Sequence, residues 1–271
     1  MKKRILAAVV LVPALLLVLF VAPKWVTAVL FGLISGLAAF ELLYSAGLVR
    51  HVRLVAYSVL AAVLVPVWCH FGMHPIWGRA GLLLFVVLMF MEMMLSNLRL
   101  KFSKVAICFV AGIFLPYLLA SIVRVMVWQT GRYLILIPFV VAFMSDTGAY
   151  FIGCRFGKHK LAPEISPNKS VEGVFGGMIF AVLGMLLYCF ILSVAFKPEV
   201  SYGYALVYGI IGSVAGVFGD LCFSVIKRQT GIKDYGNLIP GHGGALDRFD
   251  SMQVVAPLVE LLLMVLPVVV K

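Results

Sequence analysis

Residues 224–250, SVIKRQTGIKDYGNLIPGHGGALDRFD, hold a high density of side chains that can bind phosphate or a metal ion. Ammonium and guanidinium groups neutralise phosphate oxygens, and carboxylates bind hard divalent cations such as Mg²⁺. The segment lies between two apolar runs. Solubility alone would not require so many charged residues in such a loop. We therefore predict a phosphate and metal site that uses the polar residues Lys227, Arg228, Lys233, Asp234, His242, Asp247, Arg248 and Asp250.

Five glycines in the same segment favour close approach of the backbone to a ligand. Glycine tolerates positive φ, so consecutive N–H groups can point at a phosphate. We expect Gly243 and Gly244 to make such contacts, followed by Asp247 and Arg248 at the start of an apolar helix. His242 has no second His or Cys at metal-ligand spacing. A hydrogen bond from His242 to phosphate is therefore the preferred interpretation, and a solvated loop position is the alternative.

Asp220, Ser224 and Lys227 follow i, i+4, i+7 spacing, which places them on one face of a helix. That face would align a metal ligand, a hydroxyl and a phosphate-binding ammonium. Asp146 lies at a similar depth in another apolar run, about 9–10 Å from its polar end at about 1.5 Å per residue. An ionised carboxylate in hydrocarbon costs about 2.5–3.5 kcal/mol, so both aspartates need a partner or a wet cavity. The alternative to a metal site with Asp220 and Asp247 is a structural ion pair.

A second basic segment, residues 154–171, carries Lys169 shortly before Glu172. A basic loop beside a membrane is ordinarily an anchor on the cytoplasmic side, and that alternative stays open. All five aspartates of the chain, however, lie after residue 140. We therefore expect this loop and the loop at 227–251 to form opposing walls of one cleft.

The chain that must position these residues is strongly apolar. It is 63% hydrophobic and 12% charged, whereas soluble domains carry about 25% charged residues. A helix needs roughly 20 apolar residues to cross the hydrocarbon core of a bilayer. The composition therefore predicts an all-α, polytopic membrane protein with about nine transmembrane helices, at residues 4–22, 26–46, 52–70, 79–96, 104–128, 132–153, 172–196, 201–226 and 252–270.

The distribution of basic residues predicts the orientation, because cytoplasmic loops are enriched in Lys and Arg. With the N-terminus inside, sixteen of the 22 basic residues face the cytoplasm, and the outer side keeps only Lys24, Arg79, Arg124, Arg132, Lys197 and Lys271. We expect a protein of the cell membrane with its N-terminus and active site in the cytoplasm and its C-terminus outside. Residues 1–130 form five spans without a catalytic motif. Residues 131–271 form the catalytic region, with cytoplasmic loops 154–171 and 227–251.

These residues resemble the phosphatidate cytidylyltransferases, also called CDP-diacylglycerol synthases. The family signature is similar to Ser-x-x-Lys-Arg-x4-Lys-Asp-x-Gly-x-x-Ile-Pro-x-His-Gly-Gly-x-x-Asp-Arg-x-Asp. This chain matches it at Ser224, Lys227, Arg228, Lys233, Asp234, Gly236, Ile239, Pro240, His242, Gly243, Gly244, Asp247, Arg248 and Asp250. The segment SDTGAYFIGCRFGKHKLAPEISPNKSVEG resembles a second family region. Val171 departs from the family, since many bacterial relatives have Trp there, which puts local packing in doubt.

The resemblance implies a transfer of CMP from CTP to phosphatidate that depends on Mg²⁺, with possible participation of K⁺, and it implies a homodimer in the lipid bilayer. It implies that Asp220 and Asp247 hold the metal. From the residue types, Lys227 and Arg248 would act at the reacting phosphates and Asp146 and Lys169 would complete the facing wall. The remaining phosphate contacts would come from Ser224, Arg228, Lys233, His242, Gly243 and Gly244. No nucleic-acid partner is expected.

Two other functions remain open at this point. A CTP-dependent polyprenol or phytol kinase would also need a basic, metal-binding cleft beside lipid, although the long signature argues against it. An anion transporter could use intramembrane aspartates to couple cations. The sequence shows no internal repeat, however, and its acidic residues cluster at one face instead of the membrane midplane.

Overall fold

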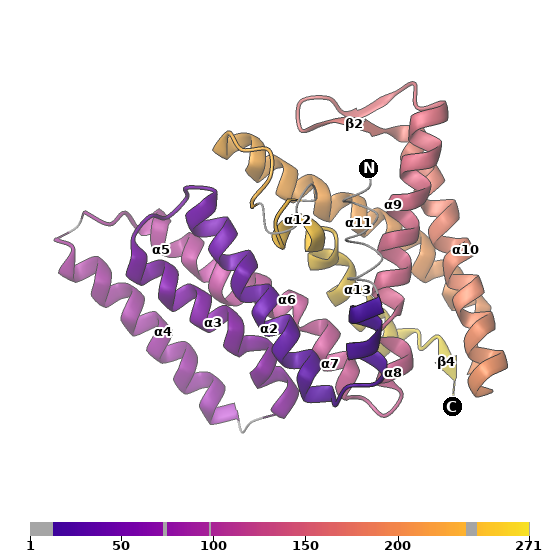
Figure 1. Ribbon diagram of the computed structural model, residues 1–271, viewed down its shortest axis with the longest axis horizontal. Coiled ribbons are helices and arrows are strands. Elements are labelled where there is room, and N and C mark those ends of the chain that lie inside the picture. The colour runs from indigo at the N-terminus through magenta and orange to yellow at the C-terminus, as the bar shows by residue number, and fades with distance from the viewer. Residues whose placement is uncertain (1–12, 73–74, 98, 237–242, 271) are drawn as a thin grey trace. The chain divides into compact units, whose positions relative to one another are not determined.

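The computed structural model describes residues 13–72, 75–97, 99–236 and 243–270. Two compact units make up the chain (Figure 1). The first unit comprises Met1–Trp128 and Gln229–Phe249, and the second comprises Gln129–Arg228 and Asp250–Lys271. The loop with the signature glycines therefore belongs with the N-terminal helices, whereas Asp220 and Asp250 belong to the second unit.

The first unit is helical in its described part. Residues 13–20 are helical, and the elements that follow are α2 (Lys24–Phe40), the π-helical turn η1 (Glu41–Ser45), α3 (Val52–Phe71), α4 (Pro75–Leu95), α5 (Phe102–Phe109), the π-helical turn η2 (Val110–Phe114), α6 (Leu115–Leu119), α7 (Ser121–Val127) and the short α12 (Leu246–Phe249). Pro116 lies just after η2 and has no amide N–H to donate, which accounts for the irregular helix there.

The second unit contains longer helices and two small antiparallel strand pairs, of which only β1–β2 is a hairpin. Its elements are α8 (Gly131–Leu134), α9 (Ile137–Phe156), β1 (Lys160–Ala162), β2 (Ser166–Ser170), α10 (Val171–Phe196), β3 (Glu199–Val200), α11 (Tyr202–Thr230, whose last two residues group with the first unit), α13 (Met252–Val265) and β4 (Val269–Val270). β1 pairs antiparallel with β2, and β3 with β4. The two strand pairs were not predicted from the sequence.

The prediction of an all-α polytopic membrane protein is confirmed. Seven helical stretches among the described residues are long and apolar enough to cross a membrane, and they correspond to the predicted spans from 26–46 to 201–226. Residues 4–12 of the first predicted span lie outside the described residues, and residues 13–20 of it are helical. The ninth is shorter than predicted, because α13 ends at Val265 and Leu266 leaves the helical conformation. Leu266 precedes a proline, and this position disfavours helical backbone angles.

Small residues allow α11 to pack closely within the second unit. A Cβ atom at Gly212 would lie 2.5 Å from Val141 of α9, and one at Gly219 would lie 3.0 Å from the carbonyl oxygen of Asp250. This confirms the close packing that the sequence predicts for the glycine flank of this helix. The contact at Gly219 brings the start of α13 beside Asp220, the next residue along α11.

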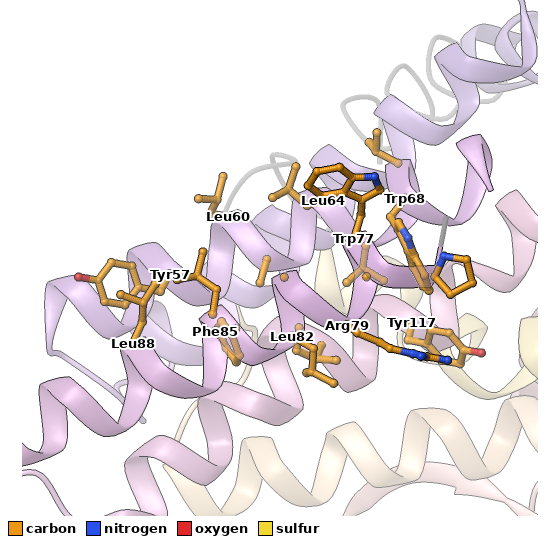
Figure 2. A pocket seen from close by; sticks show the side chains of 18 residues that line it. Tyr57, Leu60, Leu64, Trp68, Trp77, Arg79, Leu82, Phe85, Leu88 and Tyr117 are labelled. Atoms are coloured by element: carbon orange, nitrogen blue, oxygen red, sulfur yellow. The ribbon is translucent and has the colours of Figure 1, made fainter. Parts of the chain in front are cut away.

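A cavity of about 600 Å³ opens between α3 and α4 in the first unit (Figure 2). Trp68, Trp77, Leu82 and Phe85 line it, together with the polar side chains of Arg79 and Tyr117. Most side chains of α4 are exposed and apolar, as expected for a helix that contacts lipid. Among the residues that the structure describes, none of the predicted site residues lines this cavity.

Candidate active site

The carboxylate of Asp220 on α11 binds two of the predicted site residues. Its Oδ2 atom lies 2.6 Å from Lys169 Nζ, and its Oδ1 atom accepts a hydrogen bond from Ser224 Oγ at 3.1 Å. The side chains of Asp220 and Lys169 are 30% and 22% exposed, so water still reaches the pair. Ser224 is one helical turn after Asp220, which is the contact that i, i+4 spacing predicts. Lys169 comes from the second basic loop.

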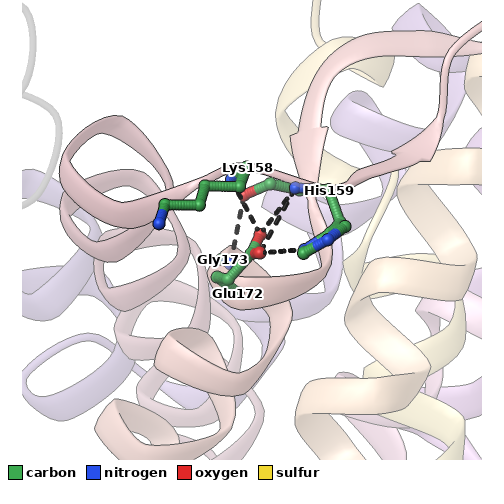
Figure 3. A network of polar contacts seen from close by, with 5 residues as sticks. Lys158, His159, Glu172 and Gly173 are labelled. Atoms are coloured by element: carbon green, nitrogen blue, oxygen red, sulfur yellow. Dashed lines mark hydrogen bonds and ion pairs between the residues drawn. The ribbon is translucent and has the colours of Figure 1, made fainter.

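The hairpin of β1 and β2 positions Lys169, and the start of α10 holds this hairpin. Ser170, directly after Lys169, caps α10 by accepting a hydrogen bond from Gly173 N–H at 3.1 Å. Glu172 accepts from the backbone N–H groups of Lys158 and His159 at 3.1 and 3.2 Å, and its Oε1 lies 2.6 Å from His159 Nδ1 (Figure 3). The Glu172 carboxylate thereby links Lys158 and His159, just before β1, to the start of α10.

Arg228 connects the end of α11 to the same hairpin. Its Nε atom donates a hydrogen bond to the carbonyl oxygen of Ile165 at 3.0 Å. Together with the Lys169–Asp220 pair, this bond gives the hairpin two contacts with the last turns of α11. The structure thus brings the predicted residues of loop 154–171 together with those on α11, inside one unit.

Three aspartates gather in the second unit. Burial raises the pKa of Asp250 to about 7, and the charges of Asp220 and Asp146 act in the same direction. The hydrogen bond from Ser251 N–H, at 2.8 Å, and the positive charge of Lys227 oppose this shift. Burial is the larger cause, and the two neighbouring carboxylates add negative charge beside Asp250. A bound cation would relieve that repulsion.

Asp247 lies in the first unit, where backbone groups hold its carboxylate. Its Oδ2 atom accepts hydrogen bonds from Tyr235 N–H at 2.8 Å and Gly244 N–H at 3.0 Å. Gly243 has φ of 80°, and a Cβ atom there would lie 2.8 Å from Asp247 Oδ2. The glycines therefore fix the orientation of the aspartate. The N–H of Gly244, which the sequence assigned to phosphate, is bound to Asp247 in this structure.

The other predicted residues divide between the two units. Lys227 lies in the second unit, while Lys233 and Arg248 lie in the first and are exposed to solvent. His242 lies outside the described residues. Within the described part of the chain, no group of three or more His, Cys, Asp or Glu side chains is arranged to hold a metal ion. The metal assignments to Asp220 and Asp247 therefore stay predictions.

Sequence reasoning missed one residue that contacts the signature loop. Glu41 is buried at 5% exposure, and it accepts hydrogen bonds from Ala245 N–H and Leu246 N–H at 2.9 and 2.8 Å. Its sequence neighbours carry no catalytic motif, so the sequence predicts no catalytic role for this region. The sequence does hold one indication of its role: Glu41 lies inside an apolar run. A carboxylate there costs free energy unless it has hydrogen-bond partners.

The chain belongs to the Cytidylyltransferase family, whose model matches residues 2–266. A Bacillus subtilis protein named phosphatidate cytidylyltransferase is 35% identical over 267 residues, which are 97% of each chain. Proteins of the same name from Staphylococcus saprophyticus and Staphylococcus haemolyticus are 40% identical over 173 residues. These two alignments span 62% of this chain and 63% of each relative, which is somewhat under two thirds of the relative's length.

Proposed function

We propose that the protein transfers the cytidylyl group of CTP to phosphatidate, giving CDP-diacylglycerol and pyrophosphate. The observation that carries the proposal is the match to the Bacillus subtilis phosphatidate cytidylyltransferase along 97% of the chain. The geometry supports it, since basic and acidic residues gather on α11 and on the hairpin between two candidate membrane spans. A lipid substrate can reach such a place with its acyl chains still in the bilayer.

The reaction needs no side-chain nucleophile. An oxygen of the phosphatidate phosphate is already anionic and forms a bond to the α-phosphorus of CTP, while the bond from that phosphorus to the bridging oxygen breaks and pyrophosphate leaves. Catalysis of this kind depends on positioning and on neutralisation of charge. In the proposal Lys227 and Arg228 on α11, with Lys233 and Arg248, neutralise the phosphates. Lys169 holds Asp220 in place from the hairpin.

The donor chemistry of the site fits magnesium. Mg²⁺ prefers oxygen ligands and is usually held by one or two carboxylates together with substrate phosphates. We propose Asp220 and Asp247 as these ligands, with K⁺ as a possible second ion. The negative charges of Asp220 and Asp146, which act on Asp250, support a cation here. When bound, Mg²⁺ would offset negative charge on the CTP phosphates.

We also propose the setting of the enzyme. It is a homodimer in the cell membrane, with the N-terminus and the active site in the cytoplasm and the C-terminus outside. The excess of Lys and Arg in the loops assigned to the cytoplasm supports this orientation. The homodimer rests on the family resemblance.

An assay with purified protein tests the function. CTP labelled at the α-phosphate, phosphatidate and Mg²⁺ should give labelled CDP-diacylglycerol, together with one pyrophosphate for each product. A CTP-dependent lipid kinase would instead transfer the γ-phosphate to a polyprenol or phytol and release CDP. Folded protein that forms no labelled lipid from phosphatidate would refute the proposal.

A further inference from the structure

Glu41 lies in the π-helical turn η1, directly after α2, and its carboxylate is directed at the signature loop. Oε1 accepts from Ala245 N–H and Oε2 accepts from Leu246 N–H. The partners are 204 and 205 positions away in the sequence, and both hydrogen bonds are buried. Hydrogen bonds from N–H groups to an ionised carboxylate are stronger than neutral ones, and a low local dielectric strengthens them further.

The loop backbone closes around this carboxylate from two sides. A Cβ atom at Gly236 would lie 2.5 Å from Glu41 Oε1, and one at Gly244 would overlap both carboxylate oxygens. Only glycine leaves room for the carboxylate at these two positions. The glycines of the loop, which the sequence assigned to phosphate contacts, therefore have a second purpose in the folded chain.

The same short segment contains Asp247. Gly244 donates its N–H to Asp247, and the next two residues donate theirs to Glu41. A further contact comes from an edge-to-face pair of Phe31 on α2 and Phe249 on α12, with ring centroids 6.1 Å apart. The middle of α2, through Phe31, and η1, through Glu41, thus hold the chain on both sides of Asp247.

We propose that Glu41 is a positioning residue for the reaction: its carboxylate fixes residues 243–247 so that Asp247 is held in its working orientation. This inference rests on the proposed function. Glu41 acts through the loop backbone and not on substrate. Through Glu41, the N-terminal helices would contribute to catalysis, although they carry no catalytic motif of their own. π-Helical turns such as η1 are frequently found at functional sites.

The test uses full-length Glu41→Gln in detergent or nanodiscs. The amide keeps the size of the side chain but presents an NH₂ group to one of the two N–H donors, so one hydrogen bond is lost. We expect kcat to fall about 10–100-fold, the usual effect of losing a partner that orients a metal ligand. The Mg²⁺ concentration for half-maximal rate should rise, and hydrogen exchange of residues 243–249 should become faster without substrate.

Glu92→Gln is the matched control. Glu92 is also a buried glutamate of the first unit, at 8% exposure, but it bonds to Arg53 and Tyr57. The control should keep the kcat, the Mg²⁺ dependence and the loop exchange of the wild type. Gly244→Ala provides a second variant, because its methyl group displaces the Glu41 carboxylate without removing the charge. It should reproduce the slow turnover and the faster exchange if Glu41→Gln fails to fold.

The proposal is overturned if folded Glu41→Gln, or folded Gly244→Ala in its place, keeps wild-type kcat and Mg²⁺ dependence, or if loop exchange is unchanged. Equal effects of the Glu41 and Glu92 substitutions on turnover also overturn it, since they would indicate a general stability effect. The exchange measurement needs no substrate. An inactive wild type would therefore refute the proposed function and leave the positioning result readable.

Discussion

Asp220 joins two elements through its carboxylate, with Lys169 of β2 on one oxygen and Ser224 of α11 on the other. A partly exposed ion pair of this kind adds little to stability, about 0–1 kcal/mol. The main effect of the ion pair is therefore to orient the Asp220 carboxylate. Lys169 holds Asp220 on the face of α11 that also carries Lys227. The charges of Lys169 and Asp220 therefore favour a role in substrate binding over a role in stability.

Asp220→Asn should lower turnover by at least about 100-fold, because the amide cannot replace a carboxylate as a ligand for Mg²⁺. The loss of the ion pair should change the free energy of unfolding by only about 1 kcal/mol. Activity with labelled CTP and thermal unfolding in the same detergent measure the two effects. Glu199→Gln, at an exposed carboxylate on β3, is the control and should leave both unchanged. Near-normal turnover of the Asp220 variant would remove it from the metal assignment.

At the scale of elements, the β1–β2 hairpin is the part of the site that sequence reasoning described only as a basic loop. Its strands are three and five residues long, and β2 contains a proline, so neither shows the alternating pattern that predicts a strand. Contacts from Glu172, Arg228 and Asp220 stabilise it instead. Such contacts depend on the folded arrangement of α10 and α11.

Glu172→Gln should loosen the hairpin, because an amide accepts fewer hydrogen bonds from Lys158 and His159 than the carboxylate does. We expect faster hydrogen exchange over residues 158–170 and a rate about tenfold lower, since Lys169 would be held less firmly. Glu164→Gln changes an exposed carboxylate in the turn of the same hairpin and is the matched control. Equal exchange in the two variants would show that Glu172 does not anchor the hairpin.

Packing of α11 offers a separate test at this scale. Gly212→Ala would place a methyl group 2.5 Å from Val141, and overpacking of this kind costs about 1–3 kcal/mol. Thermal unfolding should show the variant to be less stable, with lower activity because Asp220 lies two turns further along the helix. Gly203→Ala in the same helix meets only Ser201 Oγ at 3.9 Å and should be neutral or slightly stabilising. Equal stability of both variants would contradict the close packing.

For the whole molecule, the apolar runs predicted seven of the membrane helices, because length and hydropathy are local properties of the sequence. The signature also contains Ser224, which bonds to Asp220, and Gly244, which bonds to Asp247. The contact between Glu41 and the loop could not be predicted, since it joins positions 204 residues apart and leaves no periodic pattern. The end of α13 at Val265 was missed for a different reason: the apolar run continues, but Pro267 stops the helix.

The proposed orientation predicts that the two ends of α10 lie on opposite sides of the membrane. Its 26 residues span about 39 Å, enough to cross a hydrocarbon core of about 30 Å. In a background with all five cysteines changed to serine, Lys158→Cys before α10 and Lys197→Cys after it place single thiols at exposed positions. A maleimide that passes the outer layer of intact cells but cannot cross the cell membrane should label position 197 only. In inverted membrane vesicles it should label position 158 only. The reverse pattern would place the active site outside, and labelling of both positions from one side would show that α10 does not cross the bilayer.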